Sequence, residues 1–255
     1  MSSDDRRSLV EALQQAQQAA FGPGEYVDQE SFVSASEILA LAARAGVGSG
    51  VSVLDLCCGV AGPGRLLTRE LDCVYLGVDS SETAVAVAAE RARDLPCRFH
   101  VAEIPPLPAG TFEVVLLLET MLAFRDKAAL LEEVARVLSS GGRFAFTLEE
   151  GAPLTESEQA LMPAADTVQL TPLDEMHTLL RQAGLAVRWE EDWSGSHREV
   201  AAALVDAYAA DSSAIAERIG RRALDDLLAA HELWRDWLAT GRVRKLALVA
   251  VRVGP

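Results

Sequence analysis

The chain has 255 residues and a formal net charge of −15, and half of its residues are hydrophobic although only 5% are aromatic. This length allows one α/β domain with a sizeable core, filled mainly by Ala, Leu and Val. The acidic balance argues against a nucleic acid partner, because phosphates would be repelled. No apolar run approaches the roughly 18 residues that span a bilayer. The first residues also lack the apolar core of a secretory signal, so we expect a cytoplasmic protein without a membrane partner.

The chain opens with a predicted amphipathic helix. Leu and Ala recur every three or four positions within residues 1–20, among glutamines. Gly22-Pro23-Gly24 then predicts a turn. A second helix is expected from about Ser34 to Ala45.

Residues 51–64, VSVLDLCCGVAGPG, predict a strand, a tight loop and the start of a helix. The apolar run ends in Asp55, and Gly59 and Gly62 let the loop backbone approach a ligand without a Cβ in the way. The helix behind the loop offers unpaired N–H groups to a negative charge or a lone pair. This order is typical of the opening of a nucleotide-binding α/β sheet.

A second short strand, in residues 74–79, ends in Asp79. A carboxylate about 20 residues after a glycine loop is placed to accept hydrogen bonds from both hydroxyls of a ribose. The loop and the carboxylate together therefore indicate a nucleotide site more strongly than either does alone.

The rest of the first half alternates helices and strands. Ser81 is a suitable N-cap for the next helix, and a nearly continuous apolar run later predicts a central strand that is buried on both faces. The expected helices are 81–95 and 127–138, and the expected strands are 97–102, 112–118 and 143–148.

The second half begins with a Glu-, Pro- and Ser-bearing connection in residues 149–171. A helix at 172–183 and a sixth strand at 185–189 follow. A long helical stretch, about residues 196–240, then separates the sixth strand from the last one at 243–251. Material inserted there can cover a site, so we interpret it as a helical cap.

Four motifs resemble the successive motifs of class I S-adenosylmethionine-dependent methyltransferases. They are DLCCG at 55–59, GVD at 77–79, LPAGTFE at 107–113 and RVLSSGGRF at 136–144. The resemblance implies S-adenosylmethionine as the cofactor and a Rossmann-like α/β fold. Its sheet has seven strands, parallel except for a reversed last strand, with helices on both faces. The C-terminal half is loosely similar to sarcosine/dimethylglycine and natural-product methyltransferases, which act on small molecules.

The chain departs from the family pattern at two places. The family usually has glycine where this chain has Cys57, and often again at Ala61. The acidic residue that often follows the third strand is replaced by Val101, and Glu103 is the nearest substitute.

The resemblance assigns roles around the cofactor. Asp55, Gly59 and Gly62 would form the donor loop, Asp79 would hold the ribose, and the backbone N–H near Ala102 would meet the adenine. Segments before the first strand often fold over the donor in this family, so residues 1–46 are expected as a helical lid, with Tyr26 either touching a ligand or packing on the sheet. The expected cofactor-binding residues are Asp55, Cys57, Gly59, Gly62, Asp79, Ser80, Ala102, Glu103, Leu118 and Tyr26.

The end of the fourth strand is aimed at the same rim as the glycine loop. Glu119 at this point could hold an amine or accept a proton from a hydroxyl, or it could be a solvated strand end. His197, expected on an exposed loop at a helix start, could serve as a base. Met121, Phe124 and Trp193 could line the acceptor pocket, and the alternative for Trp193 is that it fills the core of the cap. The four cysteines lack metal-site spacing, so no metal is expected.

Methyl transfer from a sulfonium requires alignment and exclusion of water more than covalent help. The expected function is methyl transfer from S-adenosylmethionine to an O, N or C nucleophile of a small molecule in secondary or small-metabolite metabolism, by a monomer or homodimer. One alternative is a methyltransferase-like protein that promotes a non-methylating cyclisation. Another is an NAD-dependent oxidoreductase, since Cys57, Gly59 and Gly62 occupy the glycine positions of G-x-G-x-x-G. We expect a single domain, with a lid (1–46), a cofactor-binding core (47–148) and a substrate-side half (149–255).

Overall fold

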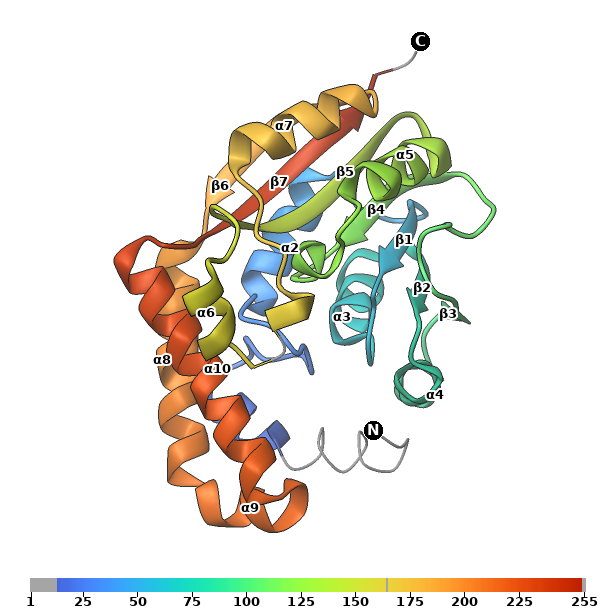
Figure 1. Cartoon of the computed structure of the whole chain (residues 1–255). Helices are drawn as coiled ribbons and strands as arrows, with labels where there is room; N and C mark the ends of the chain where they lie inside the picture. The colour runs from blue at the N-terminus through green and yellow to red at the C-terminus, as the bar shows by residue number, and fades with distance from the viewer. Residues whose placement is uncertain (1–12, 164, 254–255) are drawn as a thin grey trace.

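The computed structural model describes residues 13–163 and 165–253, which form one central sheet surrounded by helices (Figure 1). The first expected helix is helical over residues 13–20, and its residues 1–12 lie outside the described part. The strands are β1 (Ser52–Leu56), β2 (Val74–Asp79), β3 (Cys97–Val101), β4 (Phe112–Leu117), β5 (Leu138–Glu150), β6 (Leu185–Asp192) and β7 (Arg244–Arg252).

The seven strands form a single sheet in the order β3-β2-β1-β4-β5-β7-β6. Pairing is parallel from β3 to β5, whereas β7 runs antiparallel to both β5 and β6. The expected sheet, parallel except for a reversed last strand, is therefore confirmed. The carboxyl ends of β1 to β4 consequently meet at one edge, which is where ligands bind in sheets of this kind.

Helices cover both faces of the sheet (Figure 1). One face carries α5 (Lys127–Val137) and α7 (Leu173–Gln182), and the other carries α2 (Ala35–Arg44) and α3 (Gly62–Leu71). Helix α4 (Glu82–Arg91) packs against β2 and β3. Each strand at the centre is thus covered on both sides, as its continuous apolar sequence predicts.

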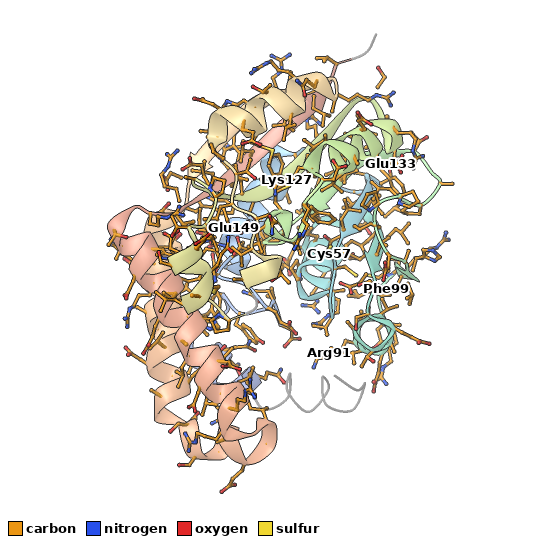
Figure 2. The ribbon with its side chains drawn as sticks, in the orientation of Figure 1. Cys57, Arg91, Phe99, Lys127, Glu133 and Glu149 are labelled. Carbon is orange, nitrogen blue, oxygen red and sulfur yellow. The ribbon has the colours of Figure 1, made fainter. Side chains whose placement is uncertain are left out.

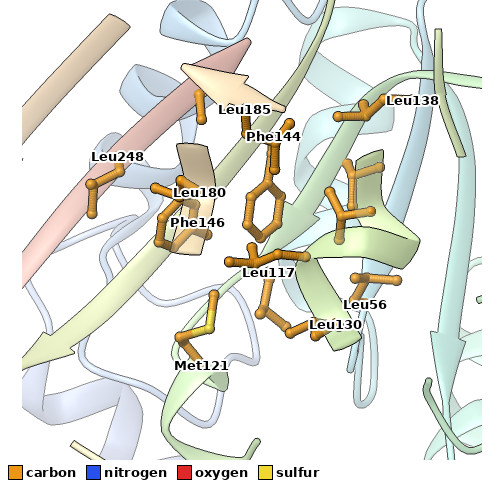
Figure 3. Packing of buried hydrophobic residues seen from close by; sticks show 14 of the residues in the cluster. Leu56, Leu117, Met121, Leu130, Leu138, Phe144, Phe146, Leu180, Leu185 and Leu248 are labelled. Atoms are coloured by element: carbon orange, nitrogen blue, oxygen red, sulfur yellow. The ribbon is translucent and has the colours of Figure 1, made fainter. Parts of the chain in front are cut away.

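The largest hydrophobic cluster lies between the sheet and helices α5 and α7 (Figure 3). Phe144 and Phe146 stand two positions apart on β5 and so share a face. Their rings stack, with 4.5 Å between centroids and 14° between ring planes. Leu117 of β4 and Leu130 of α5 are also fully buried in this cluster.

N-cap residues start two helices where the sequence predicts them. At α2, the Ser34 side chain accepts from the N–H of Glu37, and the Glu37 carboxylate accepts from the N–H of Ser34 at 2.9 Å, which makes a capping box. At α4, the Ser81 side chain accepts from the N–H of Ala84. These caps satisfy backbone donors that the first turn of a helix leaves unpaired.

Two strands are longer than the sequence pattern predicts. β5 starts at Leu138, directly after α5, and passes through Gly141 and Gly142, which precede the expected start of this strand at residue 143. Gly141 has a φ of 71°, and the pairing with β4 shifts register near this point, so the glycines make an irregularity within the strand. β6 continues to Asp192 because β7 pairs with it along that length.

Three helices lie between β6 and β7: α8 (Ser194–Ala210), α9 (Ser212–Ile219) and α10 (Arg221–Thr240). Helices α8 and α10 run side by side away from the sheet, with α9 at their far end (Figure 1). Their hydrophobic cluster includes Leu13 and Phe32 from the N-terminal segment. Shorter elements are α6 (Glu156–Leu161), η1 (Met121–Ala123) and η2 (Ala165–Thr167). Within the described residues, no helix combines the length and apolar character needed to cross a bilayer.

Gly62, the first residue of α3, gives a test of how the N-terminal segment is attached. A Cβ at this position would lie 1.8 Å from the carbonyl oxygen of Val27. We therefore expect Gly62→Ala to displace that segment and to lower the free energy of unfolding by roughly 1–3 kcal/mol, measured by urea denaturation.

The matched control is Gly195→Ala in the first turn of α8, where a Cβ would meet nothing within 4 Å. That variant should be neutral or gain about 0.5–1 kcal/mol, because alanine restricts the unfolded chain. Equal stability of the two variants would contradict the close contact at Gly62.

Candidate active site at the carboxyl ends of β1, β2 and β4

A cavity of about 640 Å³ opens at the carboxyl ends of β1, β2 and β4. Its size lies within the range of cofactor and small-molecule sites. Figure 2 labels Cys57 in the loop after β1 and Arg91 at the end of α4, which belong to two of its walls. The lining residues are Asp28, Gln29, Glu30, Ser31, Asp55, Cys57, Cys58, Gly59, Val60, Pro63, Asp79, Thr83, Ala84, Val87, Glu90, Arg91, Arg93, Asp94, Leu118, Glu119 and Thr120.

The loop after β1 has left-handed backbone at alternate positions. Cys57, Gly59 and Ala61 have φ angles of 56°, 53° and 56°. Cys57 and Ala61 stand where the family usually has glycine. The loop still has the left-handed backbone that glycine adopts freely, and this conformation costs a residue with a side chain about 1–2 kcal/mol. A Cβ on Gly59 would meet nothing within 4 Å, so the backbone there borders open space in which a ligand fits.

The thiols of this loop are not poised for nucleophilic chemistry. Burial, together with the charges of Asp79 and Asp55, raises the pKa of Cys57 to about 12. Burial also raises the pKa of Cys58. Because the thiolate is the reactive form, both side chains act here as small neutral wall residues.

Asp79 ends β2 and is fixed by the backbone. Its Oδ2 accepts from the N–H of Gly59 at 2.9 Å, and its Oδ1 accepts from the N–H of Ser81 at 2.8 Å. Each carboxylate oxygen can accept a second hydrogen bond. Asp79 therefore closes the glycine loop against β2 and still presents acceptors to a diol in the cavity.

Asp55 lies on β1 at the floor of the cavity and is 3% exposed. The hydroxyl of Tyr75 donates to its Oδ2 at 2.6 Å. Burial raises the pKa of Asp55 to about 7; the Tyr75 hydrogen bond opposes this shift and the charge of Asp79 adds to it. The carboxyl group therefore changes its charge near neutral pH.

Asp28 connects the N-terminal segment to two helices at the cavity. Its carboxylate lies 2.5 Å from Arg65 of α3 and 3.3 Å from Arg91 of α4. The side chain of Gln14 also donates to it at 3.0 Å. Charges that are largely removed from water are screened less by salt than surface pairs. These pairs hold residues 28–31 in place as one wall of the cavity.

Glu119 follows β4 with a φ of 56° and a side chain that is 7% exposed. Its backbone N–H donates to Thr147 Oγ1 at 2.5 Å. Lys245 Nζ donates to Glu119 Oε2 at 2.6 Å and to Glu149 Oε1 at 2.8 Å. Burial by itself would raise the pKa of Glu119, but the charges of Lys245 and His197 hold it below its usual value.

The structure brings six of the expected site residues to the cavity: Asp55, Cys57, Gly59, Asp79, Leu118 and Glu119. The other expected residues do not line it: Gly62, Ser80, Ala102, Glu103, Tyr26, Met121, Phe124, Trp193 and His197.

Other contacts explain the position of several of these residues. Gly62 faces the backbone of Val27, and the Tyr26 hydroxyl donates to Gln17 Oε1 at 2.9 Å. The N–H of Ala102 donates to the carbonyl of Asp79 at 3.0 Å, so this amide already has a partner. Ser80 and Glu103 are exposed outside the cavity wall.

The residues expected to line an acceptor pocket belong to the core. Met121 is fully buried in the cluster under α5 and α7, and Phe124 packs against the same cluster. Trp193 is buried in the cluster on the α2 and α3 face, with its ring 6.5 Å from that of Trp189. Trp193 therefore packs in the core of the sheet, and neither in the cavity wall nor in the cluster of the helices between β6 and β7.

The expectation that His197 lies on an exposed loop is wrong. It is fully buried in the first turn of α8. Its Nε2 lies 3.3 Å from Glu37 Oε2, and its Nδ1 lies 4.0 Å from Glu119 Oε1. The polar sequence around His197 suggested exposure, but packing of α8 on the N-terminal segment removes the ring from water. His197 therefore sits behind Glu119 and not in the cavity wall.

Sequence reasoning missed Lys245, Glu149, Asp28 and Arg91. A signal existed for the first two, because each is a charged residue in or at the end of an otherwise apolar strand, where burial requires a partner. Asp28 and Arg91 carried no such signal, since their pairing joins segments far apart in the chain.

The sheet order, the tight loop after β1 and the carboxylate that ends β2 are features of the class I S-adenosylmethionine-dependent methyltransferase fold. Residues 53–142 match a family described as a methyltransferase domain. This stretch is a methyltransferase domain of the class whose cofactor is S-adenosylmethionine.

Two curated relatives are methyltransferases. The chain is 29% identical over 178 residues to methyltransferase GfsG of Streptomyces halstedii, which covers 65% of this chain and 63% of GfsG. It is 31% identical over 157 residues to the 27-O-demethylrifamycin SV methyltransferase of Amycolatopsis mediterranei, which covers 57% and 58%. The aligned part is thus less than two thirds of either relative.

Among solved structures, the [4+2]-cyclase SpnF has a TM-score of 0.76 at 23% identity, covering 98% of this chain and 94% of SpnF. At this level of identity the likeness shows a shared fold.

We expect Asp55 to make stability fall as pH rises. Its folded pKa of about 7 lies above the value near 3.9 of an exposed aspartate, so between these values the folded state binds more protons. The stabilising contribution is fully present below about pH 4 and is lost as pH rises through about 7. The loss is at most about 4 kcal/mol.

Urea denaturation from pH 4 to 8 tests this expectation with Asp55→Asn, which keeps an acceptor for Tyr75. The stability of the variant relative to the wild type should increase between pH 4 and 7 and then level off. Parallel curves for the two proteins would show that Asp55 does not titrate in this range.

Proposed function

We propose that the protein transfers the methyl group of S-adenosylmethionine to an O, N or C nucleophile of a small molecule. The observation that carries the proposal is the cavity at the carboxyl ends of β1, β2 and β4, where backbone amides hold Asp79 beside an open loop. The match of residues 53–142 to a methyltransferase domain supports it.

In this proposal the bound cofactor supplies an activated methyl group, and the chain binds, aligns and excludes water. Asp79 accepts from the ribose hydroxyls, and the loop at Gly59 lets the backbone approach the donor. Asp28, paired with Arg65 and Arg91, keeps the N-terminal wall closed on the cavity. We further propose that residues 1–46 act as a lid and that the helices in residues 196–240 act as a cap on the substrate side.

The acceptor belongs to the same proposal. The similarity to a methyltransferase named for a demethylrifamycin supports secondary metabolism as the setting. Because the donor is already activated, the acceptor needs only to be aligned with the methyl carbon and the sulfur. A fixed general base is therefore not required.

A second candidate is a non-methylating cyclisation that uses the same enclosure. It is supported by the likeness to the [4+2]-cyclase SpnF over nearly the whole of both chains, which concerns the fold. An NAD-dependent oxidoreductase is less well supported, because Cys57 replaces the first glycine of the dinucleotide motif.

Binding of S-adenosylhomocysteine to Asp79→Asn tests the ribose assignment. We expect at least about a tenfold loss of affinity in calorimetry, since a hydrogen bond to a charged group contributes about 1.5–3 kcal/mol. The matched control is Asp126→Asn at the start of α5, where Asp126 Oδ1 also accepts from a backbone N–H at 2.9 Å but lies outside the cavity wall. Unchanged affinity in Asp79→Asn would remove the assignment, and tighter binding of NAD than of either sulfur ligand by the wild type would favour an oxidoreductase.

Product stoichiometry separates methyl transfer from cyclisation. Incubation with methyl-labelled S-adenosylmethionine and a small-molecule library should give labelled product and S-adenosylhomocysteine in equal amounts, measured by mass spectrometry. A product that is an isomer of its substrate, formed without release of S-adenosylhomocysteine, would favour the cyclase.

A further inference from the structure

Three charged side chains lie together at the inner end of the cavity. Glu119, Lys245 and Glu149 have side chains that are 7%, 3% and 0% exposed. Glu149 and Lys245 are directly opposite each other on β5 and β7, so the antiparallel pairing itself brings them together. An unpaired charge at this depth costs several kcal/mol, and mutual pairing is what keeps these groups charged.

The Lys245 ammonium is held from four sides. It lies 2.6 Å from Glu119 and 2.8 Å from Glu149, and 5.2 Å from the ring centroids of both Phe32 and Trp234. Contact of a cation with aromatic faces is favourable. Phe32 belongs to the N-terminal segment and Trp234 to α10, so the cap and the N-terminal segment together fix the ammonium against Glu119.

The two oxygens of Glu119 differ in their partners. Oε2 accepts from Lys245, whereas Oε1 is buried and has no well-aligned hydrogen bond, and the backbone N–H of Phe32 lies at this carboxylate and helps to lower its pKa. The nearest ring nitrogen, Nδ1 of His197, is 4.0 Å away. Glu119 also lines the cavity, so a ligand there can approach this carboxylate. A carboxylate at a cavity wall that is only partly hydrogen-bonded favours a ligand that carries positive charge or N–H groups.

The charged groups around Glu119 also favour a positively charged ligand. The groups that face Glu119 are Lys245 from β7, Glu149 from β5, His197 from α8 with Glu37 of α2 behind it, and Asp55 and Asp79 across the cavity. Two carboxylates share the one ammonium of Lys245, which leaves the Glu119 end of the cluster negative. A cationic ligand centre is the chemistry that complements it.

We propose that Lys245 is a positioning residue that holds Glu119 as a carboxylate at the cavity, and that Glu119 there stabilises a cationic centre of the bound methyl donor, its sulfonium or its ammonium. The inference rests on the proposed function, which supplies the donor. It assigns Glu119 a role in binding the donor, and it explains why Lys245 is buried in the last strand.

Three ligands distinguish the two sources of positive charge. S-adenosylmethionine carries the sulfonium and the ammonium, S-adenosylhomocysteine carries only the ammonium, and 5′-methylthioadenosine carries neither. Calorimetry with Glu119→Gln should show about a tenfold loss of S-adenosylmethionine affinity, since a unit charge a few ångström away is worth more than 1 kcal/mol at a partly buried site. Glu82→Gln, in the first turn of α4 and outside the cavity wall, is the control and should bind as the wild type does.

The outcomes separate cleanly. A loss confined to S-adenosylmethionine assigns the contact to the sulfonium. An equal loss for both amino-acid-bearing ligands, without a loss for 5′-methylthioadenosine, assigns it to the ammonium. Unchanged affinities, or an equal loss for all three ligands, overturn the inference and leave the proposed function standing. A wild-type protein that binds none of the three overturns both.

The pH dependence of binding tests the role of Lys245. In Lys245→Met the carboxylates of Glu119 and Glu149 lose their shared cation, so one of them takes up a proton at low pH. Loss of that proton restores the negative charge, so the affinity for S-adenosylmethionine should rise from pH 5 to 7. The comparison is made with the wild type at each pH, which cancels the titration of Asp55. Lys245→Arg keeps the charge and should follow the wild type.

The double variant Lys245→Met/Glu149→Gln removes one positive and one negative charge, so it provides the same test if the single variant does not fold. It should show the same added pH dependence. A pH profile parallel to that of the wild type in whichever variant folds would mean that Lys245 does not control the charge of Glu119.

Discussion

The structure depends on one constraint: parallel strands bring their carboxyl ends to a single edge, and this chain places a carboxylate at or near three of those ends. Each is stabilised in a different way. Asp79 accepts backbone N–H groups, Asp55 accepts a hydroxyl from Tyr75, and Glu119 pairs with Lys245. Burial raises the pKa of Asp55, whereas the charges of Lys245 and His197 outweigh burial at Glu119 and lower its pKa, although both carboxylates border one cavity.

The parts of the chain outside the central sheet are joined to it by buried polar contacts. Glu37 forms the capping box of α2 and also lies 3.3 Å from His197 of α8, so the same side chain links α2 to the helices between β6 and β7. Asp28 joins the same segment to α3 and α4. Because Asp28 lines the cavity and His197 lies behind Glu119, which also lines it, closure of the site and attachment of the flanking helices are parts of one arrangement.

Much of the fold could be predicted because its signals are local. Apolar runs gave the strands, three- and four-residue spacing gave the helices, and Ser34 and Ser81 gave two helix starts. The site could be predicted only where a residue belongs to a strand end or a loop, as Asp55 and Asp79 do. His197 was misplaced because polar neighbours in the sequence do not report which helix later covers them.

The sequence by itself determined the succession of strands along the chain, the glycine-type loop and the carboxylates near the strand ends, because each follows from spacing within short segments. Only the tertiary structure decided the partners of those carboxylates. Lys245 meets Glu119 across 126 positions of the chain, and it does so because β7 is inserted antiparallel beside β5. The charge of a buried group depends on such distant neighbours and on its removal from water, and neither is encoded in local spacing.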